Sequence, residues 1–369
     1  MKAWHRKRAG GTVMGILGRV QQVIAMGALL LLVACGGEGS TATSAEGGDT
    51  ESGNTQPAQT KSLTVGTSAS ITLHTLPAIA VDQGFDADNG LDLEIQMFPS
   101  GSAMVEAVAT GELQIAQAGD VPFLSLASGG VPVRLLGELT DSGANYTFYM
   151  AADHAPENPE DVHGKRIGLP FGSTSSIIMD QFIAEYGLEE SQVELIDLAP
   201  DAIAAAYSSG EIDGFVLWSP GSNRAAAERD SVKVHDAYTS YLPCCEGEQK
   251  LGAAHTVVFG LQEILDDDPD LVERYLQTLL DAKEFLENPD TVEEARGIIA
   301  EELDVDDEIV QQALEEIEYP LSLDQALLDD LSAAGEELVA SGSVTEVPPL
   351  EELVVPDALS SVAPDSVDL

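Results

Sequence analysis

Four consecutive hydroxyl residues stand at a predicted strand-to-helix junction: Ser173, Thr174, Ser175 and Ser176, in the segment PFGSTSSIIMDQF. The apolar run RIGL (166–169) precedes them, and a segment with helical spacing, IIMDQFIAEYG, follows. A single such residue is enough to cap the first turn of a helix. The surplus hydroxyls, together with the free N–H groups of a helix N-terminus, favour a site for a small anion. Capping and anion binding are therefore the two interpretations of this turn.

The first 61 residues are predicted to lie outside the fold. A basic head precedes the apolar run VIAMGALLLLVA, which has the length of a signal-peptide core and is short for a membrane span. The run ends LVAC at Cys35, and this tetrapeptide resembles the bacterial lipobox, whose cysteine carries the lipid. Residues 1–35 are thus expected to be a lipoprotein signal peptide, and 36–61 a disordered tether without apolar side chains. The protein is expected outside the cytoplasm, lipid-anchored to the cell membrane.

The charge balance is strongly acidic, with 64 Asp and Glu against 16 Lys and Arg and a formal net charge of −48. Phosphate would be repelled, which argues against a nucleic-acid partner. A hydrophobic content of 44% argues against a disordered chain. The acidic excess indicates a solvated surface suited to high salt, where charges are screened within about 3 Å at 1 M. An anion site in this protein must therefore be built from local donors.

Two of the three cysteines are adjacent, Cys244 and Cys245, in YLPCCEGEQ. An oxidising compartment favours a disulfide, although neighbours can bond only through a strained ring. A vicinal disulfide, free thiols and metal ligation are the alternatives, with a loop staple favoured. Metal spacing is absent, because His255 stands ten residues beyond Cys245, so neither a metal nor a cofactor is expected.

From Ser62 the chain alternates β-rich and helical segments, which is typical of an α/β fold with a mostly parallel sheet. The first cycle of predicted elements comprises strands at 62–67, 91–98, 112–119, 131–139 and 145–151 and helices at 74–84, 102–111 and 121–130. The second comprises strands at 166–169, 193–198, 212–220, 232–237 and 253–261, with helices after the hydroxyl turn and at 202–210 and 224–229, before a helical C-terminal region. In such folds ligands bind near the carboxyl ends of the strands.

Three segments then resemble one family. EDVHGKRIGLPFGSTSS (160–176), VELIDLAPDAIAAAYSSGEIDGFVLWSP (193–220) and FPSGSAMVEAVATGELQIAQAGDVP (98–122) are similar to the periplasmic binding proteins of ABC importers for taurine, aliphatic sulfonates and nitrate. The taurine and sulfonate branch is the most similar. The resemblance implies a monomeric, two-lobed α/β protein of the type II periplasmic-binding-protein fold, without catalysis, that closes on a small anionic or zwitterionic ligand and delivers it to a permease and its ATPase. The expected boundaries are 62–150 plus 258–345 for lobe 1, 151–257 for lobe 2 and 346–369 for a C-terminal tail.

The resemblance also implies where the ligand binds. Ser173, Thr174 and Ser175 would donate hydrogen bonds to sulfonate oxygens. Further expected cleft residues are Ser68, Gly119, Asp120 and Trp218, although Ser68 and Asp120 also fit helix capping and Trp218 also fits packing within a lobe. His74 and His255 fit structural roles better, with His255 kept as an outside candidate near the hinge.

Two features depart from the family. Asp120 stands where sulfonate binders often have a small hydroxyl residue; it would suit the ammonium of a zwitterion, or exclude anions. The loop YLPCCEGEQKLGAAH differs from the family's usual stretch. The alternatives are a binding protein for nitrate or a pyrimidine precursor of thiamine, a surface lipoprotein without a permease, and an enzyme such as a desulfinase. Against the last, Glu246 and Glu248 would raise a nearby thiol pKa.

Overall fold

The computed structural model describes residues 60–369. The predicted signal peptide, the lipid on Cys35 and nearly all of the predicted tether lie outside the described residues. The first strand begins at Lys61, one residue before the expected start of the fold. Within the described residues no helix combines the length and the apolar character that crossing a bilayer requires.

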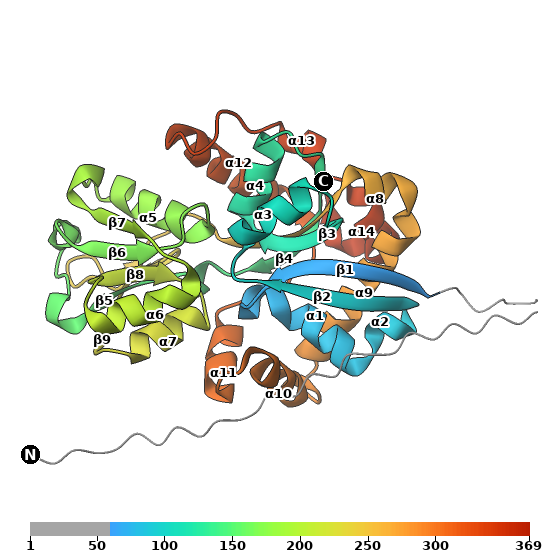
Figure 1. Ribbon diagram of the computed structural model, residues 1–369, viewed down its shortest axis with the longest axis horizontal. Coiled ribbons are helices and arrows are strands. Elements are labelled where there is room, and N and C mark those ends of the chain that lie inside the picture. Colours follow the sequence, from blue (N-terminus) through green and yellow to red (C-terminus); the bar gives the residue numbers. More distant parts are fainter. Residues whose placement is uncertain (1–59) are drawn as a thin grey trace, which may run out of the picture. The chain divides into compact units, whose positions relative to one another are not determined.

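The described chain forms two main β-sheets, each covered by helices on both faces (Figure 1). The first sheet has the order β2 (Leu91–Phe98), β1 (Lys61–Ser68), β3 (Ile115–Gly119), β12 (His255–Leu261) and β4 (Val133–Asp141). The second has the order β11 (Gly247–Glu248), β10 (Thr239–Ser240), β9 (Ser231–Asp236), β5 (Thr147–Ala151), β8 (Gly214–Leu217), β6 (Arg166–Leu169) and β7 (Glu194–Asp197). These sheets define the two expected lobes.

The helices follow the alternation expected from the sequence. Around the first sheet lie α1 (Ile71–Gln83), α2 (Phe85–Asp88), α3 (Gly101–Ala109), α4 (Asp120–Ser128), α8 (Gln262–Asp267), α9 (Pro269–Glu287), α10 (Val292–Leu303), α11 (Asp307–Glu315), α12 (Gln325–Ala340), α13 (Leu350–Leu353) and α14 (Pro356–Val362). In the second lobe α5 (Thr174–Glu185) lies on one face of the sheet, and α6 (Pro200–Ser209) and α7 (Gly221–Ala227) lie on the other (Figure 1).

Local sequence signals explain where these elements begin and end. The Ser70 side chain accepts a hydrogen bond from Leu73 N at the start of α1, and Gly84 ends this helix with a φ of 76°, a left-handed conformation that glycine adopts freely. The strands β3, β8 and β12 are buried along their whole length. They consist mainly of small or apolar residues, with Gln117 in β3 and His255 and Thr256 in β12 as the polar exceptions, because helices cover both faces of each sheet.

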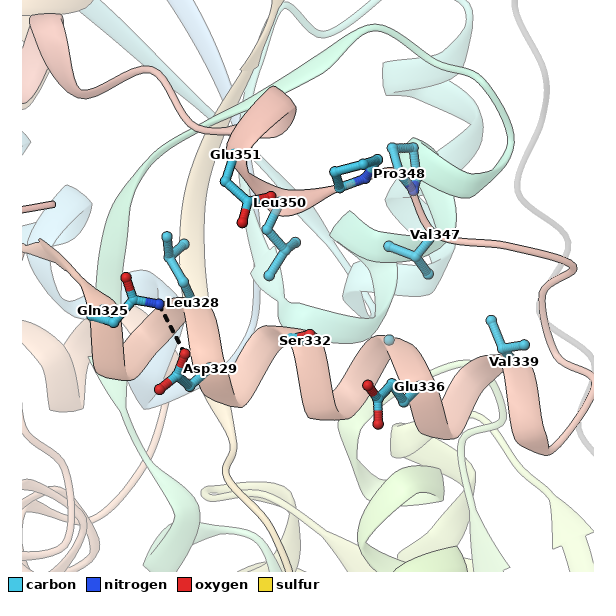
Figure 2. Close-up of a pocket in the computed structure, with 12 residues that line it drawn as sticks. Gln325, Leu328, Asp329, Ser332, Glu336, Val339, Val347, Pro348, Leu350 and Glu351 are labelled. Atoms are coloured by element: carbon cyan, nitrogen blue, oxygen red, sulfur yellow. Dashed lines mark hydrogen bonds between the residues drawn. The ribbon is translucent and has the colours of Figure 1, made fainter.

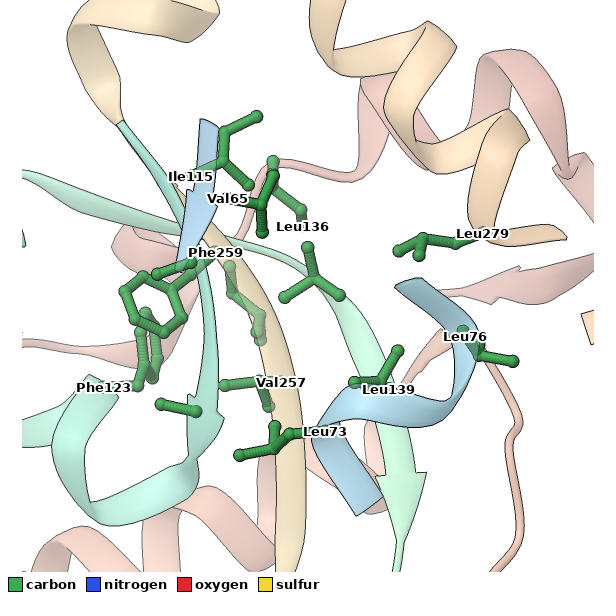
Figure 3. Close-up of a cluster of buried hydrophobic side chains, with 14 of the residues drawn as sticks. Val65, Leu73, Leu76, Ile115, Phe123, Leu136, Leu139, Val257, Phe259 and Leu279 are labelled. Carbon is green, nitrogen blue, oxygen red and sulfur yellow. The ribbon is translucent and has the colours of Figure 1, made fainter. Parts of the chain in front are cut away.

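Each lobe has its own hydrophobic core. In the first, side chains of β1, β3, β4 and β12 meet those of α1, α4 and α9, and Val65, Leu76 and Val257 are fully buried (Figure 3). In the second, Phe148, Phe182 and Phe215 are buried among strands and α5. Each buried side chain of this size contributes about 1.5–3 kcal/mol to stability.

The expectation of mostly parallel sheets is wrong, because both sheets are mixed. β1 pairs with β2 and β3 in parallel, but β12 runs antiparallel to β3 and β4. In the second sheet β6 is parallel to β7 and β8, whereas β5 is antiparallel to β8 and β9. The reason is the connection between the lobes. β5 carries the chain into the second sheet, and β12 carries it back into the first. Each starts at the end of its sheet where the parallel strands finish, so it runs antiparallel to its two neighbours.

The expected lobe boundaries also need correction. Strand β5 begins at Thr147 and pairs only within the second sheet, so the first crossing falls at 142–146 rather than at 150. Strand β12 starts at His255, so the return crossing falls at 249–254 rather than at 257. The hydrogen-bonded pairing assigns β5 to the second sheet and β12 to the first. The alternating sequence pattern alone does not show which sheet a strand joins.

The expected C-terminal tail is an integral part of the first lobe. Its last strand, β14 (Val367–Asp368), pairs in parallel with β13 (Leu323–Asp324), and Val354 forms a bridge with Leu135 of β4. Leu353 and Leu359 belong to the first core. Lobe 1 therefore extends to the end of the chain.

Candidate functional site between the strand ends

Strand ends from both sheets converge at the crossings between the lobes. β4 ends at Asp141, which pairs with His255 at the start of β12, and β3 ends beside the same point. In the second sheet β8 ends at Leu217, opposite Thr147, where β5 leaves the first crossing. Each lobe thus presents the carboxyl ends of its forward strands and the N-termini of the following helices to this region, where a ligand site is expected.

A buried hydrogen bond joins the two lobes here. Thr174 Oγ1, at the start of α5, donates to Asp120 Oδ1, at the start of α4, over 2.6 Å, and the backbone N–H of Val121 donates to the same oxygen over 2.7 Å. Asp120 is 2% exposed and Thr174 is 1% exposed. A Cβ on Gly119 would lie 2.7 Å from Thr174 Oγ1, so only glycine fits without a shift. The structure therefore brings together Gly119, Asp120 and Thr174, three of the residues expected to contact the ligand.

In the hydroxyl turn (173–176), two hydroxyls bond within the turn, whereas the Thr174 hydroxyl bonds Asp120 of the other lobe. The Ser173 hydroxyl donates to Pro170 O over 2.6 Å, and Ser176 Oγ donates to Ser173 O while accepting from Ser173 N. These two hydroxyls are engaged within the turn, as the capping interpretation predicted. Ser175 Oγ instead is fully buried and has no hydrogen-bond partner among the described residues.

Ser68 carries the matching hydroxyl in the first lobe. It ends β1, and the parallel register of β1 and β3, with Gly66 beside Ala116, places it close to the end of β3 and Gly119. Ser68 Oγ is buried and also has no hydrogen-bond partner among the described residues. A buried hydroxyl without a partner costs free energy, so a ligand that accepts from Ser68 and Ser175 would be favoured.

Charges near the site depend on His255, the outside candidate from the sequence. Its Nδ1 lies 2.6 Å from Glu138 Oε1, and its Nε2 lies 3.2 Å from Asp330 Oδ2 of α12. Burial acts to lower the pKa of His255, but the bonds to Asp330 and Glu138 outweigh burial and raise this pKa to about 10. His255 is therefore a buried imidazolium at neutral pH, next to the end of β3.

Both burial and the positive charge of His255 affect the pKa of the Asp120 carboxyl. Burial raises the pKa of the Asp120 carboxyl, and the Thr174 hydroxyl and the charge on His255 act in the opposite direction. The net shift is upward, so the site holds its carboxyl less ionised than a surface aspartate. A cationic donor beside Asp120, such as an ammonium, would oppose this shift and favour the carboxylate.

Two aromatic side chains of the second lobe, Tyr146 and Trp218, pack together beside the crossing. The rings of Tyr146 and Trp218 have centroids 5.7 Å apart, and both side chains are almost fully buried in the second core. Burial raises the pKa of Tyr146, the charge of Asp120 adds to this effect, and a hydrogen bond with Thr174 opposes it. Trp218 is 7% exposed, which places it in lobe packing as well as beside the crossing.

Two cavities lined by α12 do not include the residues of this site. One of about 430 Å³ runs along α12 and the segment 347–351 (Figure 2). Asp329, Glu336 and Glu351 line it without a basic residue, which makes it unsuited to an anion. The other, of about 440 Å³, lies between α5 and α12 and is lined by Gly172 and Ser176, but not by Ser173, Thr174 or Ser175.

The adjacent cysteines, Cys244 and Cys245, carry free thiols in this structure. Their Sγ atoms lie 2.8 Å apart, and Cys244 is exposed. No group of three or more His, Cys, Asp or Glu side chains among residues 60–369 is arranged to hold a metal ion. The vicinal disulfide and the loop staple stay predictions, and a disulfide between adjacent residues would be strained.

Sequence reasoning missed two groups at the site, the Tyr146 hydroxyl and the pair Glu138–Asp330 that surrounds His255. Glu138 and Asp330 are 117 and 75 residues from His255 in the chain. No local spacing connects them. The one available signal was a histidine at the start of a buried strand.

The two mixed sheets, the paired crossings and the helical cover define a two-lobed α/β protein of the periplasmic-binding-protein type. The chain belongs to the NMT1-like family, whose model matches residues 56–300. A taurine-binding periplasmic protein of Escherichia coli (strain K12) is 30% identical over 211 residues, which cover 57% of this chain and 62% of that protein. The chain thus spans less than two thirds of this relative in that match. An aliphatic sulfonates-binding protein of Bacillus subtilis (strain 168), itself described as putative, is 22% identical over 320 residues, covering 85% of this chain and 87% of that protein.

Solved structures share the fold. The alkanesulfonate-binding protein SsuA of Xanthomonas axonopodis pv. citri superposes with a TM-score of 0.69 at 17% identity, covering 81% of this chain and 99% of that one. The desulfurization enzyme DSZB also shares the fold, with a TM-score of 0.58 at 17% identity, covering 83% of this chain and 99% of that one. The fold therefore occurs in a binding protein and in an enzyme, and the site must separate the two.

Proposed function

We propose that this protein is an extracytoplasmic solute-binding lipoprotein of an ABC importer and captures a small, taurine-like organosulfonate between its lobes. The observation that carries the proposal is the pair of buried hydroxyls without partners among the described residues, Ser68 on one lobe and Ser175 on the other, beside the Thr174–Asp120 bond between the lobes. The names of the sulfonate- and taurine-binding relatives support the ligand class.

The chemistry of a sulfonate fits this arrangement. A sulfonate is ionised at ordinary pH and needs several donors when it leaves water. Ser68, Ser175 and the first N–H groups of α5 supply donors, and the positive end of the α5 dipole points the same way. An ammonium on the ligand would pair with Asp120, which favours a zwitterion over nitrate. Trp218 would contact the apolar carbons between the two charges.

Closure of the lobes would be coupled to binding. A ligand shifts an open-closed equilibrium only through contacts it makes better in one state, and a ligand between Ser68 and Ser175 contacts both lobes. In the absence of ligand the Thr174–Asp120 bond supports the closed arrangement. We propose that a permease reads this closed form, and that Cys35 carries the lipid that keeps the protein at the membrane.

A binding role is also favoured over an enzyme with a cysteine nucleophile. Cys245 lies near Tyr186, the residue that follows α5, whereas Thr174 starts this helix. A helix of 12 residues separates them by about 18 Å. The thiols therefore cannot reach a ligand held by the hydroxyl turn.

Titration calorimetry in molar chloride tests the proposal, with taurine, an alkanesulfonate, nitrate and a pyrimidine as ligands. Taurine binding should weaken about 10- to 100-fold in Ser175→Ala, because one buried donor is lost. Ser176→Ala is the matched control, since its hydroxyl is bonded within the turn. Heat with a pyrimidine alone, or equal effects of the two variants, would contradict the proposed ligand and site. Lipid incorporation that persists in Cys35→Ser would contradict the anchor.

A further inference from the structure

The C-terminal end of α10, in lobe 1, is capped by a side chain of lobe 2. Arg224 Nη2, in α7, donates to Leu303 O over 2.9 Å and to Asp304 O over 2.7 Å. Leu303 belongs to the first core, whereas Ala225, next to Arg224, belongs to the second. The last carbonyls of a helix have no N–H partner further along the helix, and they form the negative end of its dipole. A guanidinium suits this position, and here the other lobe supplies it.

A second basic side chain joins lobe 2 to the same part of lobe 1. α10 and α11 pack together as a helical hairpin (residues 292–316) beside the second lobe (Figure 1). Lys233 Nζ, in β9, lies 3.5 Å from Oε1 of Glu316, the residue that follows α11, and their side chains are 25% and 27% exposed. Lobe 2 therefore contacts the hairpin at its turn, through Arg224, and at its end, through Lys233.

Short segments connect the Arg224 contact to both halves of the candidate site. In lobe 1, α10 packs against α1, which begins three residues after Ser68. In lobe 2, α7 begins three residues after Trp218. The same segments also meet directly, because the backbone N–H of Ile71 donates to Ser219 O of the other lobe over 3.5 Å. The contact can therefore control the distance between the two halves of the site without touching a ligand.

The acidic composition gives a cation between the lobes a particular value. The chain has 64 acids and 16 bases, so its acidic lobes repel each other as they approach. Arginine stays protonated at any ordinary pH, and the Arg224 contact is therefore independent of pH. Salt at 1 M screens charges over about 3 Å, which weakens the repulsion between lobes more than it weakens hydrogen bonds of 2.7 and 2.9 Å. The contact should thus persist in high salt.

We propose that Arg224 is a positioning residue: by capping α10 across the lobes, it holds the protein in its closed form, with or without ligand, and slows the release of a bound ligand. The part that concerns the ligand rests on the proposed function, whereas closure can be measured without any ligand. A ligand leaves only from the open form. A contact made only in the closed form therefore lowers the dissociation rate by the factor by which it favours closure.

Hydrogen exchange of the ligand-free protein tests closure, because the buried Ile71 amide bonds a lobe 2 carbonyl only when the lobes meet. Arg224→Gln should speed exchange at Ile71 about 3- to 10-fold, since two bonds to a charged group at a helix end are lost. Arg224→Lys keeps a cationic donor and should recover much of the protection. Arg229→Gln is the matched control: it removes the same charge from lobe 2, but Arg229 bonds Asp153 and Tyr207 O within that lobe. Its exchange at Ile71 should stay within about twofold of wild type.

The dissociation rate of taurine, measured by stopped flow, is the second readout and should rise by the same factor in Arg224→Gln. Asp304→Asn should change neither rate, because asparagine also adopts the left-handed conformation of this residue and Arg224 bonds its backbone oxygen. The proposal is overturned if the Ile71 amide is unprotected in wild type, if its exchange is unchanged in Arg224→Gln, or if Asp304→Asn has the same effect as Arg224→Gln. If wild type does not bind taurine but its exchange still depends on Arg224, the proposed ligand is wrong and the closure role of Arg224 is supported.

Discussion

Thr174 Oγ1 donates a hydrogen bond of 2.6 Å to Asp120 Oδ1, although 54 residues separate the two and each belongs to a different lobe. Both side chains are buried, so the bond forms only when the N-termini of α4 and α5 meet. The contact therefore reports lobe closure as well as the chemistry of the site, and it can be tested from either side.

Thr174→Val keeps the shape of the side chain and removes its hydroxyl. We expect the free energy of unfolding to fall by about 1–3 kcal/mol, because a buried carboxyl loses a donor. Urea unfolding measures this change. Thr278→Val is the control, because its buried hydroxyl bonds only the Arg274 carbonyl within α9, and its cost should be about 0.5 kcal/mol. Equal costs would show that the bond between lobes contributes nothing specific.

Gly119→Ala tests the same contact by adding a methyl group next to the Thr174 hydroxyl. The φ of Gly119 is −64°, so alanine fits the backbone, but its Cβ would stand 2.7 Å from Thr174 Oγ1. We expect about 1–3 kcal/mol of destabilisation and a more open molecule by small-angle scattering. Gly297→Ala, in α10 with open space around it, should stabilise by about 0.5–1 kcal/mol. A Gly119→Ala variant as stable and as closed as wild type would refute the packing argument.

The ion cluster of His255 predicts a pH dependence. The pKa of His255 rises from 6.5 in the unfolded chain to about 10 in the fold, so the folded state binds the extra proton between these values. Its contribution is complete below pH 6.5 and is lost as pH rises toward 10, with a slope of at most about 1.4 kcal/mol per unit. Urea midpoints measured across this range should fall for wild type and stay flatter for His255→Gln. Parallel profiles would contradict the assignment.

Asp213 and Arg166 hold the second sheet together. Arg166 Nη2 lies 2.7 Å from Asp213 Oδ1, and Arg166 Nε and N both donate to Asp213 Oδ2. Asp213→Ala should destabilise by about 2 kcal/mol, since three charge-assisted bonds disappear. Asp153→Ala is the control, because its pair with Arg229 is exposed and should cost under about 1 kcal/mol. Chemical denaturation of both variants decides whether the difference exists.

The local sequence predicted several elements in both lobes. RIGL forms β6 at the residues expected, the hydroxyl turn starts α5, and Leu91–Phe98 forms β2 as the alternation indicated. These elements depend on neighbours in the chain: apolar periodicity and side chains that cap a helix within three residues. The same local forces also explain why Ser173 and Ser176 serve the turn itself.

The sequence by itself therefore determined the alternation of elements, the family resemblance and the hydroxyl turn. Only the tertiary structure decided that Thr174 meets Asp120, that Glu138 and Asp330 enclose His255, and that β5 and the last residues join the sheets they do. The three side-chain contacts join residues 54, 117 and 75 positions apart. Their partners are chosen by strand register and by burial across both lobes, and neither quantity is encoded in local spacing.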